Sequence, residues 1–289
     1  MKRLIVNGDD FGFTSNTNEG IQRGYREGIL TSTTLMANGT AFDDAVEIAL
    51  ANPGLGVGCH VALVDGDPVA PPDEVPSLLS TNGRLPGSVM ELTRRLGRSI
   101  QVRDVEREIS AQVQRVIDAG ITPTHLDTHK HAHMHPTILK LLVRVAADFG
   151  IRRIRKPFEV IAPTIGGTAA RSQRAVHIKQ WMASVATLPM APFFNDIVRK
   201  CGIITPDRFY GIALTGLMDA AAIIKLLGFK GDGCVELMCH PGIHDSELDR
   251  ARTRLKESRE VELEALTSPG VRSAVINQAI KLISYRELQ

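Results

Sequence analysis

Runs of apolar residues alternate along the chain with segments in which apolar residues recur every three or four positions. Short runs rich in apolar or β-branched residues are typical of strands buried in a parallel sheet. We expect strands at residues 4–6, 31–36, 55–63, 152–155, 210–214 and 234–239, and another around His125. Helical spacing predicts helices at 15–28, 41–51, 88–97, 104–119, 136–149, 217–228, 247–266 and, before a short extended tail, 271–289. Six or seven strand–helix units imply parallel pairing through right-handed crossovers, and they favour a closed (β/α) barrel over an open sheet.

The 289 residues show no internal repeat and no linker-like segment, so we expect one domain over residues 1–289. An apolar insertion is expected at about 158–208, and it holds the only tryptophan, Trp181. Its stretch 178–198 has two interpretations. It packs its apolar side on the barrel, or it forms a lid beside the pocket that accepts the lipid portion of a substrate.

Composition narrows the function classes. The formal net charge of +2 gives no electrostatic case for binding nucleic acid. The four cysteines form no CxxC pair, which indicates a reducing, cytoplasmic location. The apolar part of the N-terminus is too short for a signal peptide, and no segment approaches the roughly 20 apolar residues of a transmembrane helix.

Five of the nine histidines lie between Thr124 and Pro136, together with an aspartate. On an extended strand, His125, Asp127 and His129 would point to one face. Imidazole and carboxylate groups that converge at a strand end are typical of a divalent-metal site. His131 shares the same even spacing, so spacing alone does not select which histidine binds metal.

Other polar side chains fall at the ends of predicted strands, where (β/α) barrels carry their reactive groups. Asp9 and Asp10 end the first strand, His60 lies late in the third, Arg155 ends another, and His240 ends the last. Neighbouring residues on a strand point in opposite directions, so the two aspartates can take different roles. A metal hydrolase needs three protein ligands, a base and an acid, and this set supplies them. There is no P-loop, no GxGxxG and no GxSxG motif.

These motifs resemble the YdjC-type carbohydrate deacetylases over nearly the whole chain. The matching segments are residues 4–12, 28–34, 56–60, 124–136 and 236–242. The Asp-Asp-Phe-Gly and His-Leu-Asp-Thr-His elements within them are the most specific. Within the family, the chain is most similar to the hopanoid-biosynthesis-associated branch called HpnK. That similarity rests on residues 63–69, 71–76 and 210–216.

The resemblance implies a distorted (β/α) barrel of six or seven strands, related to the polysaccharide deacetylase barrels. It also implies one divalent metal ion, Mg²⁺ or Zn²⁺, held by Asp10, His60 and His129. His125 and Asp127 would then support the ligands from behind and fix their tautomers.

By the same resemblance, Asp9 is the base that activates the attacking water, Arg155 orients that base, and His240 is the acid that protonates the departing amine. The implied activity removes the acetyl group from an N-acetylglucosamine unit of a glycosylated hopanoid lipid. The implied partners are a small-molecule or lipid-linked amino sugar, a membrane touched peripherally, and a second subunit in a homodimer. Alternatives are a chitooligosaccharide deacetylase of sugar catabolism, a metal-dependent phosphoesterase, and a non-catalytic metal-binding protein, which would need neither Asp9 nor His240.

Overall fold

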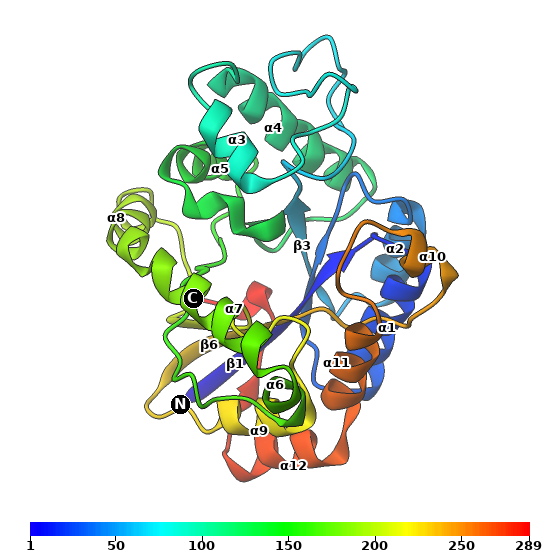
Figure 1. The fold of residues 1–289 in the computed structure, drawn as a ribbon, viewed down its shortest axis with the longest axis vertical. Coiled ribbons are helices and arrows are strands. Elements are labelled where there is room, and N and C mark those ends of the chain that lie inside the picture. Colours follow the sequence, from blue (N-terminus) through cyan, green and yellow to red (C-terminus); the bar gives the residue numbers. More distant parts are fainter.

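The computed structural model describes residues 1–289 and is built on one parallel sheet (Figure 1). The strands are β1 (Lys2–Phe11), β2 (Ser32–Leu35), β3 (Gly56–Val61), β4 (Leu126–Thr128), β5 (Arg208–Tyr210), β6 (Gly233–Cys239) and β7 (Lys281–Leu282). Their order is β4-β3-β2-β1-β6-β5, with β7 beside β1. All pairs are parallel, as the alternation of strands and helices predicts.

The sheet curls toward closure beyond its β4 edge. Leu126 of β4 bridges to Ile154, and Arg153 bridges to Ile204, shortly before β5. The prediction of a distorted barrel is therefore confirmed. The predicted strand at 152–155 is reduced to single bridges on either side, because Pro157 follows closely and offers no N–H for a ladder.

Helices cover the outside of the sheet, close to the predicted positions. They are α1 (Ser15–Glu27), α2 (Phe42–Ala51), α3 (Val89–Arg95), α4 (Val102–Asp118), α5 (Pro136–Asp148), α9 (Ala220–Leu227), α10 (Ser246–Arg250), α11 (Glu257–Thr267) and α12 (Pro269–Asn277). The insertion forms α6 (Thr168–Ser172), α7 (Arg174–Thr187) and α8 (Ala191–Lys200), and the short 3₁₀ turns are η1 (His129–Met134), η2 (Leu188–Met190) and η3 (Tyr285–Glu287). None of these helices is long and apolar enough to cross a membrane.

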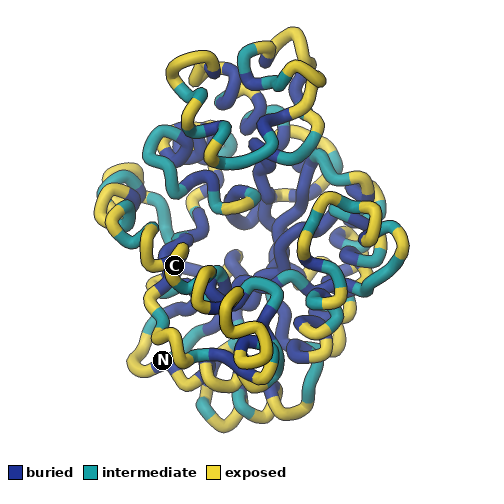
Figure 2. Tube along the Cα trace, in the orientation of Figure 1, coloured by how far each residue is buried: buried dark blue, intermediate teal, exposed yellow.

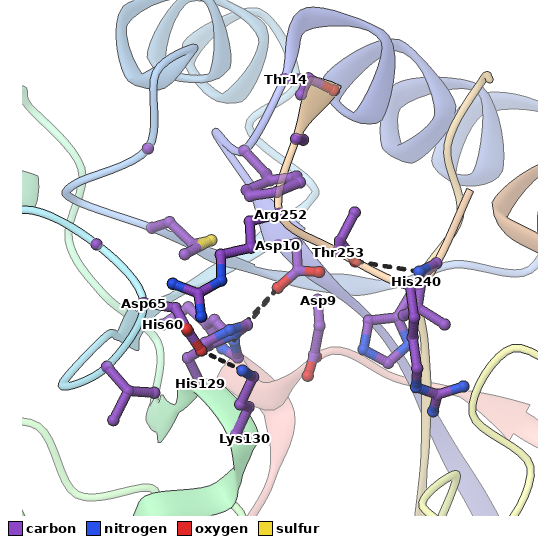
Figure 3. Close-up of a pocket in the computed structure, with 18 of the residues that line it drawn as sticks. Asp9, Asp10, Thr14, His60, Asp65, His129, Lys130, His240, Arg252 and Thr253 are labelled. Carbon is purple, nitrogen blue, oxygen red and sulfur yellow. Dashed lines mark hydrogen bonds and ion pairs between the residues drawn. The ribbon is translucent and has the colours of Figure 1, made fainter. Parts of the chain in front are cut away.

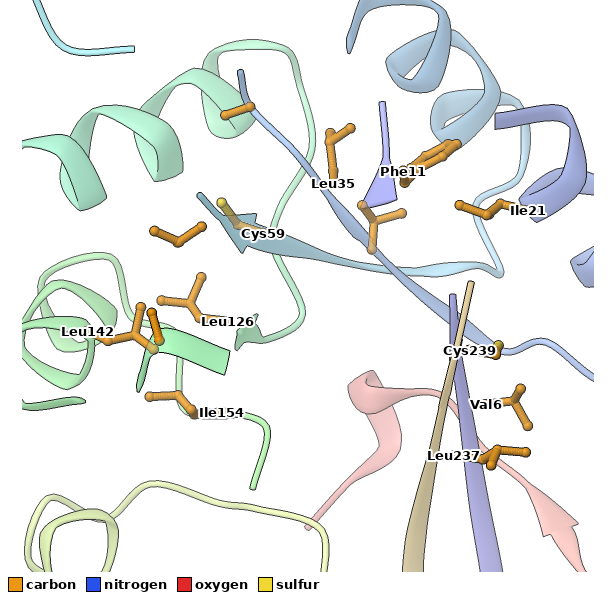
Figure 4. Close-up of a cluster of buried hydrophobic side chains, with 14 of the residues drawn as sticks. Val6, Phe11, Ile21, Leu35, Cys59, Leu126, Leu142, Ile154, Leu237 and Cys239 are labelled. Carbon is orange, nitrogen blue, oxygen red and sulfur yellow. The ribbon is translucent and has the colours of Figure 1, made fainter. Parts of the chain in front are cut away.

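Buried residues concentrate on the strands and on parts of the helices (Figure 2). The main core joins both flanks of the sheet. Figure 4 shows Leu142 of α5 near Leu126 and Ile154, while Ile21 of α1 lies near Phe11. A second cluster of Ile5, Cys234, Ile283, Tyr285 and Leu288 packs the C-terminal tail against β1 and β6.

One helix prediction is wrong. The expected helix 247–266 is two helices, α10 and α11. The segment between them leaves the helical path, and Arg252 and Arg254 line a pocket there. The helix expected within 271–289, with a short extended tail, is α12. It ends at Asn277, and the longer tail forms β7 and η3.

One strand prediction is displaced. The strand expected at 210–214 lies at Arg208–Tyr210 and shares only Tyr210 with that range. Gly211, which follows it, takes a φ of 142° beside the Met238 carbonyl, where a Cβ would lie 2.5 Å from that oxygen.

Candidate active site

Side chains from four strand ends meet in one cavity of about 1030 Å³ (Figure 3). Asp9 and Asp10 come from β1, His60 from β3, His129 from the turn after β4, and His240 from the end of β6. The structure thus gathers the residues predicted as base, acid and metal ligands at the carboxyl edge of the sheet. This is the edge at which barrel enzymes place their chemistry.

Asp9 and Asp10 both line this cavity, contrary to the expectation that they point in opposite directions. The pairing of β1 with β2 slips between Gly8 and Phe11, and Asp10 adopts a left-handed φ of 67°. A bulge of this kind turns a side chain toward the other face of the strand. A non-glycine residue in this conformation is strained, and such strain is concentrated at functional sites.

Asp10, His60 and His129 form a candidate metal cluster, in which all three ligand atoms lie within 4.8 Å of one another. Asp10 Oδ1 lies 3.6 Å from His60 Nε2 and 3.4 Å from His129 Nδ1, and the two nitrogens lie 3.3 Å apart. Asp10 Oδ1 is buried and accepts no hydrogen bond. With His129 in its Nε2–H tautomer and the Nε2 proton of His60 displaced, three lone pairs converge here. The donor set therefore fits a divalent cation.

The groups behind this cluster fix its orientation. His60 Nδ1 donates to Asp127 Oδ1 at 2.7 Å, which turns the Nε2 lone pair toward the cluster. Arg259 Nη2 donates to Asp10 Oδ2 at 2.6 Å, which leaves Oδ1 free. Burial raises the pKa of Asp10, but Arg259 together with His129 and His240 holds the pKa well below its usual range. Burial lowers the pKa of His60, but the Asp127 carboxylate together with Asp9 and Asp10 raises the pKa to about 9.

A second cluster of buried charge, centred on Arg155, holds Asp9. Arg155 donates from Nη1 and Nη2 to the two oxygens of Asp9 at 2.7 and 2.6 Å, so the contact is bidentate. Its Nε donates to Glu236 at 2.8 Å, and its Nη1 lies 2.5 Å from Asp127. Tyr285 OH donates to the other oxygen of Glu236 at 2.5 Å. Burial raises the pKa of Asp9, and the Arg155 guanidinium brings it below the usual value.

His240 lies at the wall of the cavity, with Nδ1 buried and without a hydrogen-bond partner. Its backbone N–H donates to Glu262 at 2.6 Å, which ties the end of β6 to α11. The backbone after His240 passes close to α1, since a Cβ on Gly20 would lie 2.4 Å from Gly242. Burial lowers the pKa of His240 to about 4, so the ring is neutral in the resting protein.

The other histidines of the 124–136 run take different places. His125 stacks on Tyr285 with ring centroids 3.5 Å apart and bonds Thr124, and it makes no hydrogen bond to a candidate ligand. The strand ends at Thr128, and Lys130 and His131 both adopt a left-handed φ of 53°. Strand alternation therefore does not extend to His131, whose ring lines the cavity outside the metal cluster.

Three residues that touch the site were not among the predicted site residues: Glu236, Arg259 and Tyr285. Glu236 does have a sequence signal, since it is the only charged residue in the apolar strand 233–239. Arg259 and Tyr285 have none, because they reach Asp10 and Glu236 from 249 and 49 positions away.

Known proteins are similar to this chain, in sequence or in fold, over almost their full lengths. A carbohydrate deacetylase of Geobacillus stearothermophilus is 35% identical over 286 residues, covering 98% of this chain and 96% of the relative. A chitooligosaccharide deacetylase of Salmonella typhimurium is 32% identical over 291 residues, covering 99% and 98%. The crystal structure of an Enterococcus faecalis V583 protein assigned to cellobiose-phosphate cleavage superposes with a TM-score of 0.78 at 24% identity, covering 98% of this chain and 97% of that chain. The sequence model of the YdjC-like protein family matches residues 3–277. This chain therefore belongs to the YdjC-like protein family.

Proposed function

We propose that this protein is a metal-dependent carbohydrate N-deacetylase that acts on an N-acetylglucosamine unit. One observation carries the proposal. The Asp10, His60 and His129 cluster lies in the same cavity as Asp9 and His240, so that ligands, base and acid face one space. Relatives named carbohydrate deacetylase and chitooligosaccharide deacetylase support the class of reaction.

The residues divide the work of amide hydrolysis. A divalent ion at the Asp10 cluster would polarise the acetyl carbonyl and favour ionisation of the attacking water. Asp9, ionised and held by Arg155, accepts the proton of that water as the new C–O bond forms. The C–N bond then breaks, and His240 delivers a proton to the leaving nitrogen. The products are acetate and a free amine. His240 is neutral at rest, so the proton that it delivers is the one that Asp9 takes from the water, and it passes to His240 before the C–N bond breaks.

The test compares Asp9→Asn with His129→Ala by acetate release and by calorimetric titration with Mg²⁺ or Zn²⁺. Asp9→Asn should keep metal binding and lose about 10²–10⁴-fold in kcat, the usual contribution of a general base. His129→Ala should lose both. Asp43→Asn, at an exposed position on α2, is the matched control and should match wild type. A near wild-type rate for Asp9→Asn would remove Asp9 from this role.

The finer substrate proposal is a glycosylated hopanoid, by similarity to the HpnK branch. Chitooligosaccharides are the alternative, favoured by the Salmonella relative. Acetate release should be measured in parallel from N-acetylglucosaminyl hopanoid and from N,N′-diacetylchitobiose, with His129→Ala as control. Release from the lipid-linked sugar alone supports the hopanoid assignment, and release from chitobiose alone moves the role to sugar catabolism. Release from neither, with several divalent ions tried, contradicts the proposed deacetylase.

A further inference from the structure

The insertion exposes an unusual number of large apolar side chains. We call Ile178, Met182, Val185 and Phe193 the α7–α8 apolar face. Their exposed fractions run from 37% for Ile178 to 64% for Phe193. With Val160 and Val176, they make up six of the thirteen large apolar residues that the whole chain exposes. Such a concentration on one segment indicates a surface that meets a partner.

The geometry of α7 explains this face. Ile178, Met182 and Val185 recur at i, i+4 and i+7, so they form one stripe along the helix. Buried His177 and Ser184 anchor one flank of the helix. A helix on a protein surface normally turns polar side chains to water, and this one turns an apolar stripe outward.

Positive charge surrounds the apolar face. Residues 160–202 carry five basic side chains and one acidic one, a formal excess of four positive charges, although the whole chain carries only +2. Arg199 and Lys200 pair with the single acid, Asp196. Arg174 and Lys179, on α7 itself, have no carboxylate within ion-pair distance. This face therefore combines apolar side chains that can insert into a bilayer with cations that have no ion-pair partner.

The same helix borders the active-site cavity. Gln180 and Ala183 of α7 line it, and so do Arg250, Arg252 and Arg254 on the segment that includes α10. Figure 1 shows α7 and α10 well apart, so the cavity opens between two segments that both carry cations. None of the three arginines forms an ion pair.

We propose that the α7–α8 apolar face docks on the surface of an anionic phospholipid bilayer. Met182, Phe193 and their neighbours would enter the boundary between headgroups and acyl chains, while Arg174 and Lys179 would meet lipid phosphates. A second copy of this chain fits less well, because two faces with the same excess of positive charge repel each other. Gln180 and Ala183 lie on the opposite side of α7 from the stripe, so docking would leave the cavity side of the helix facing away from the bilayer. The docking itself does not depend on the amide chemistry.

The test is flotation of the full-length protein with vesicles of phosphatidylcholine alone or of phosphatidylcholine and phosphatidylglycerol at a ratio of about 7:3. Wild type should float with the anionic vesicles and much less with the neutral ones. Arg174→Gln/Lys179→Gln should weaken partition about five-fold per charge, since each cation near an anionic surface contributes about that much. Ile178→Ser/Met182→Ser/Phe193→Ser should weaken it more than about tenfold through lost apolar burial.

Two matched controls keep the result specific. Leu50→Ser/Ile276→Ser changes exposed apolar residues elsewhere, and Arg94→Gln/Arg98→Gln removes two unpaired cations from another surface. Both should float like wild type, and thermal melts should show every variant folded. The proposal is overturned if wild type binds neither vesicle, or if the control variants lose as much binding as the test variants. It is also overturned if light scattering shows a dimer that only the triple apolar variant dissociates, because the face would then join two copies. Since no arm measures acetate release, failure here leaves the deacetylase proposal untouched.

Discussion

Proteins usually expose charged side chains and bury apolar ones. The floor of the cavity and the insertion both depart from this rule, the first by burying charge and the second by exposing apolar side chains. Around Arg155 the barrel interior buries a guanidinium and three carboxylates with almost no solvent exposure. On α7 the chain exposes a stripe of isoleucine, methionine and valine. Buried charge is unfavourable unless an opposite charge compensates it, and exposed apolar surface is unfavourable unless another surface covers it. Each region therefore calls for an account of what compensates its unfavourable groups.

The two regions differ in how far the chain satisfies them by itself. Every nitrogen of Arg155 meets a carboxylate, so the barrel interior is complete without a partner. Asp10 Oδ1, at the edge of this interior, is buried and accepts no hydrogen bond. The side chains of the α7–α8 apolar face are 37–64% exposed. The interior should therefore govern stability, and the insertion should govern binding.

The largest expected effect comes from removing Arg155. Arg155→Met fills similar space but leaves Asp9, Asp127 and Glu236 as buried like charges, so we expect a loss of about 3–5 kcal/mol in the free energy of unfolding. Arg155→Lys should recover only part of it, because one ammonium cannot form the bidentate contact. Urea unfolding measures both. Arg98→Met, at an exposed position, should stay within about 0.5 kcal/mol of wild type. If Arg155→Met were as stable as wild type, the interior would not be organised by charge.

Measuring the free energy of unfolding at several pH values distinguishes buried carboxylates that are paired with a cation from those that are not. Glu159 is buried at the start of the insertion and accepts only the N–H groups of Gly211 and Ala213. Burial raises its pKa from 4.5 to about 7. Because the folded pKa exceeds the unfolded one, its contribution to stability is complete below about pH 4.5 and is lost as pH rises through 7.

Wild type should therefore lose up to about 3 kcal/mol relative to Glu159→Gln between pH 4.5 and 8. Urea unfolding of both proteins across that range is the measurement, and the difference between the two curves isolates Glu159 from the other buried acids. A constant difference would show that the two N–H donors keep Glu159 ionised throughout. Glu159 would then behave like a carboxylate that has its own guanidinium.

A smaller effect is expected at the far end of the Arg155 cluster. Tyr285→Phe removes the hydroxyl that donates to Glu236 and leaves a buried carboxylate oxygen unpaired, at a cost of about 1–3 kcal/mol. The ring and its stacking on His125 remain. Tyr210→Phe, whose hydroxyl forms no hydrogen bond within the chain, serves as the control in the same urea assay. Equal stability of the two variants would place Glu236 outside the organised cluster.

Tyr285 also shows where prediction from sequence ends. Strand and helix positions follow from local periodicity, and the strands β1, β3 and β6 and the helix α5 lie close to their expected residues. The break between α10 and α11 cannot be predicted from the sequence, since the pattern of charged residues expected of one helix continues through it. The contacts of Tyr285 and Arg259 depend on chain crossings that no spacing encodes.

The candidate site divides in the same manner. The polar residues at the strand ends can be predicted from the sequence pattern, and the family resemblance selects Asp10, His60 and His129 as a set. Spacing leaves His129 and His131 equivalent, and they become distinct only where the backbone turns left-handed after Thr128. The direction of Asp10 is likewise decided by one backbone angle at a bulge, which a pattern of apolar and polar letters does not contain.

The smallest expected effect is the sharpest check on the contrast between the two regions. Met182→Ser should change the free energy of unfolding by less than about 0.5 kcal/mol, because the side chain is 60% exposed. Met218→Ser makes the same substitution at a residue that is 1% exposed, and it should cost about 2–5 kcal/mol. Urea unfolding at submicromolar protein concentration measures both while suppressing self-association. If Met182→Ser cost as much as Met218→Ser, the α7–α8 apolar face would be part of the core in solution, and it would have no apolar surface left for a membrane.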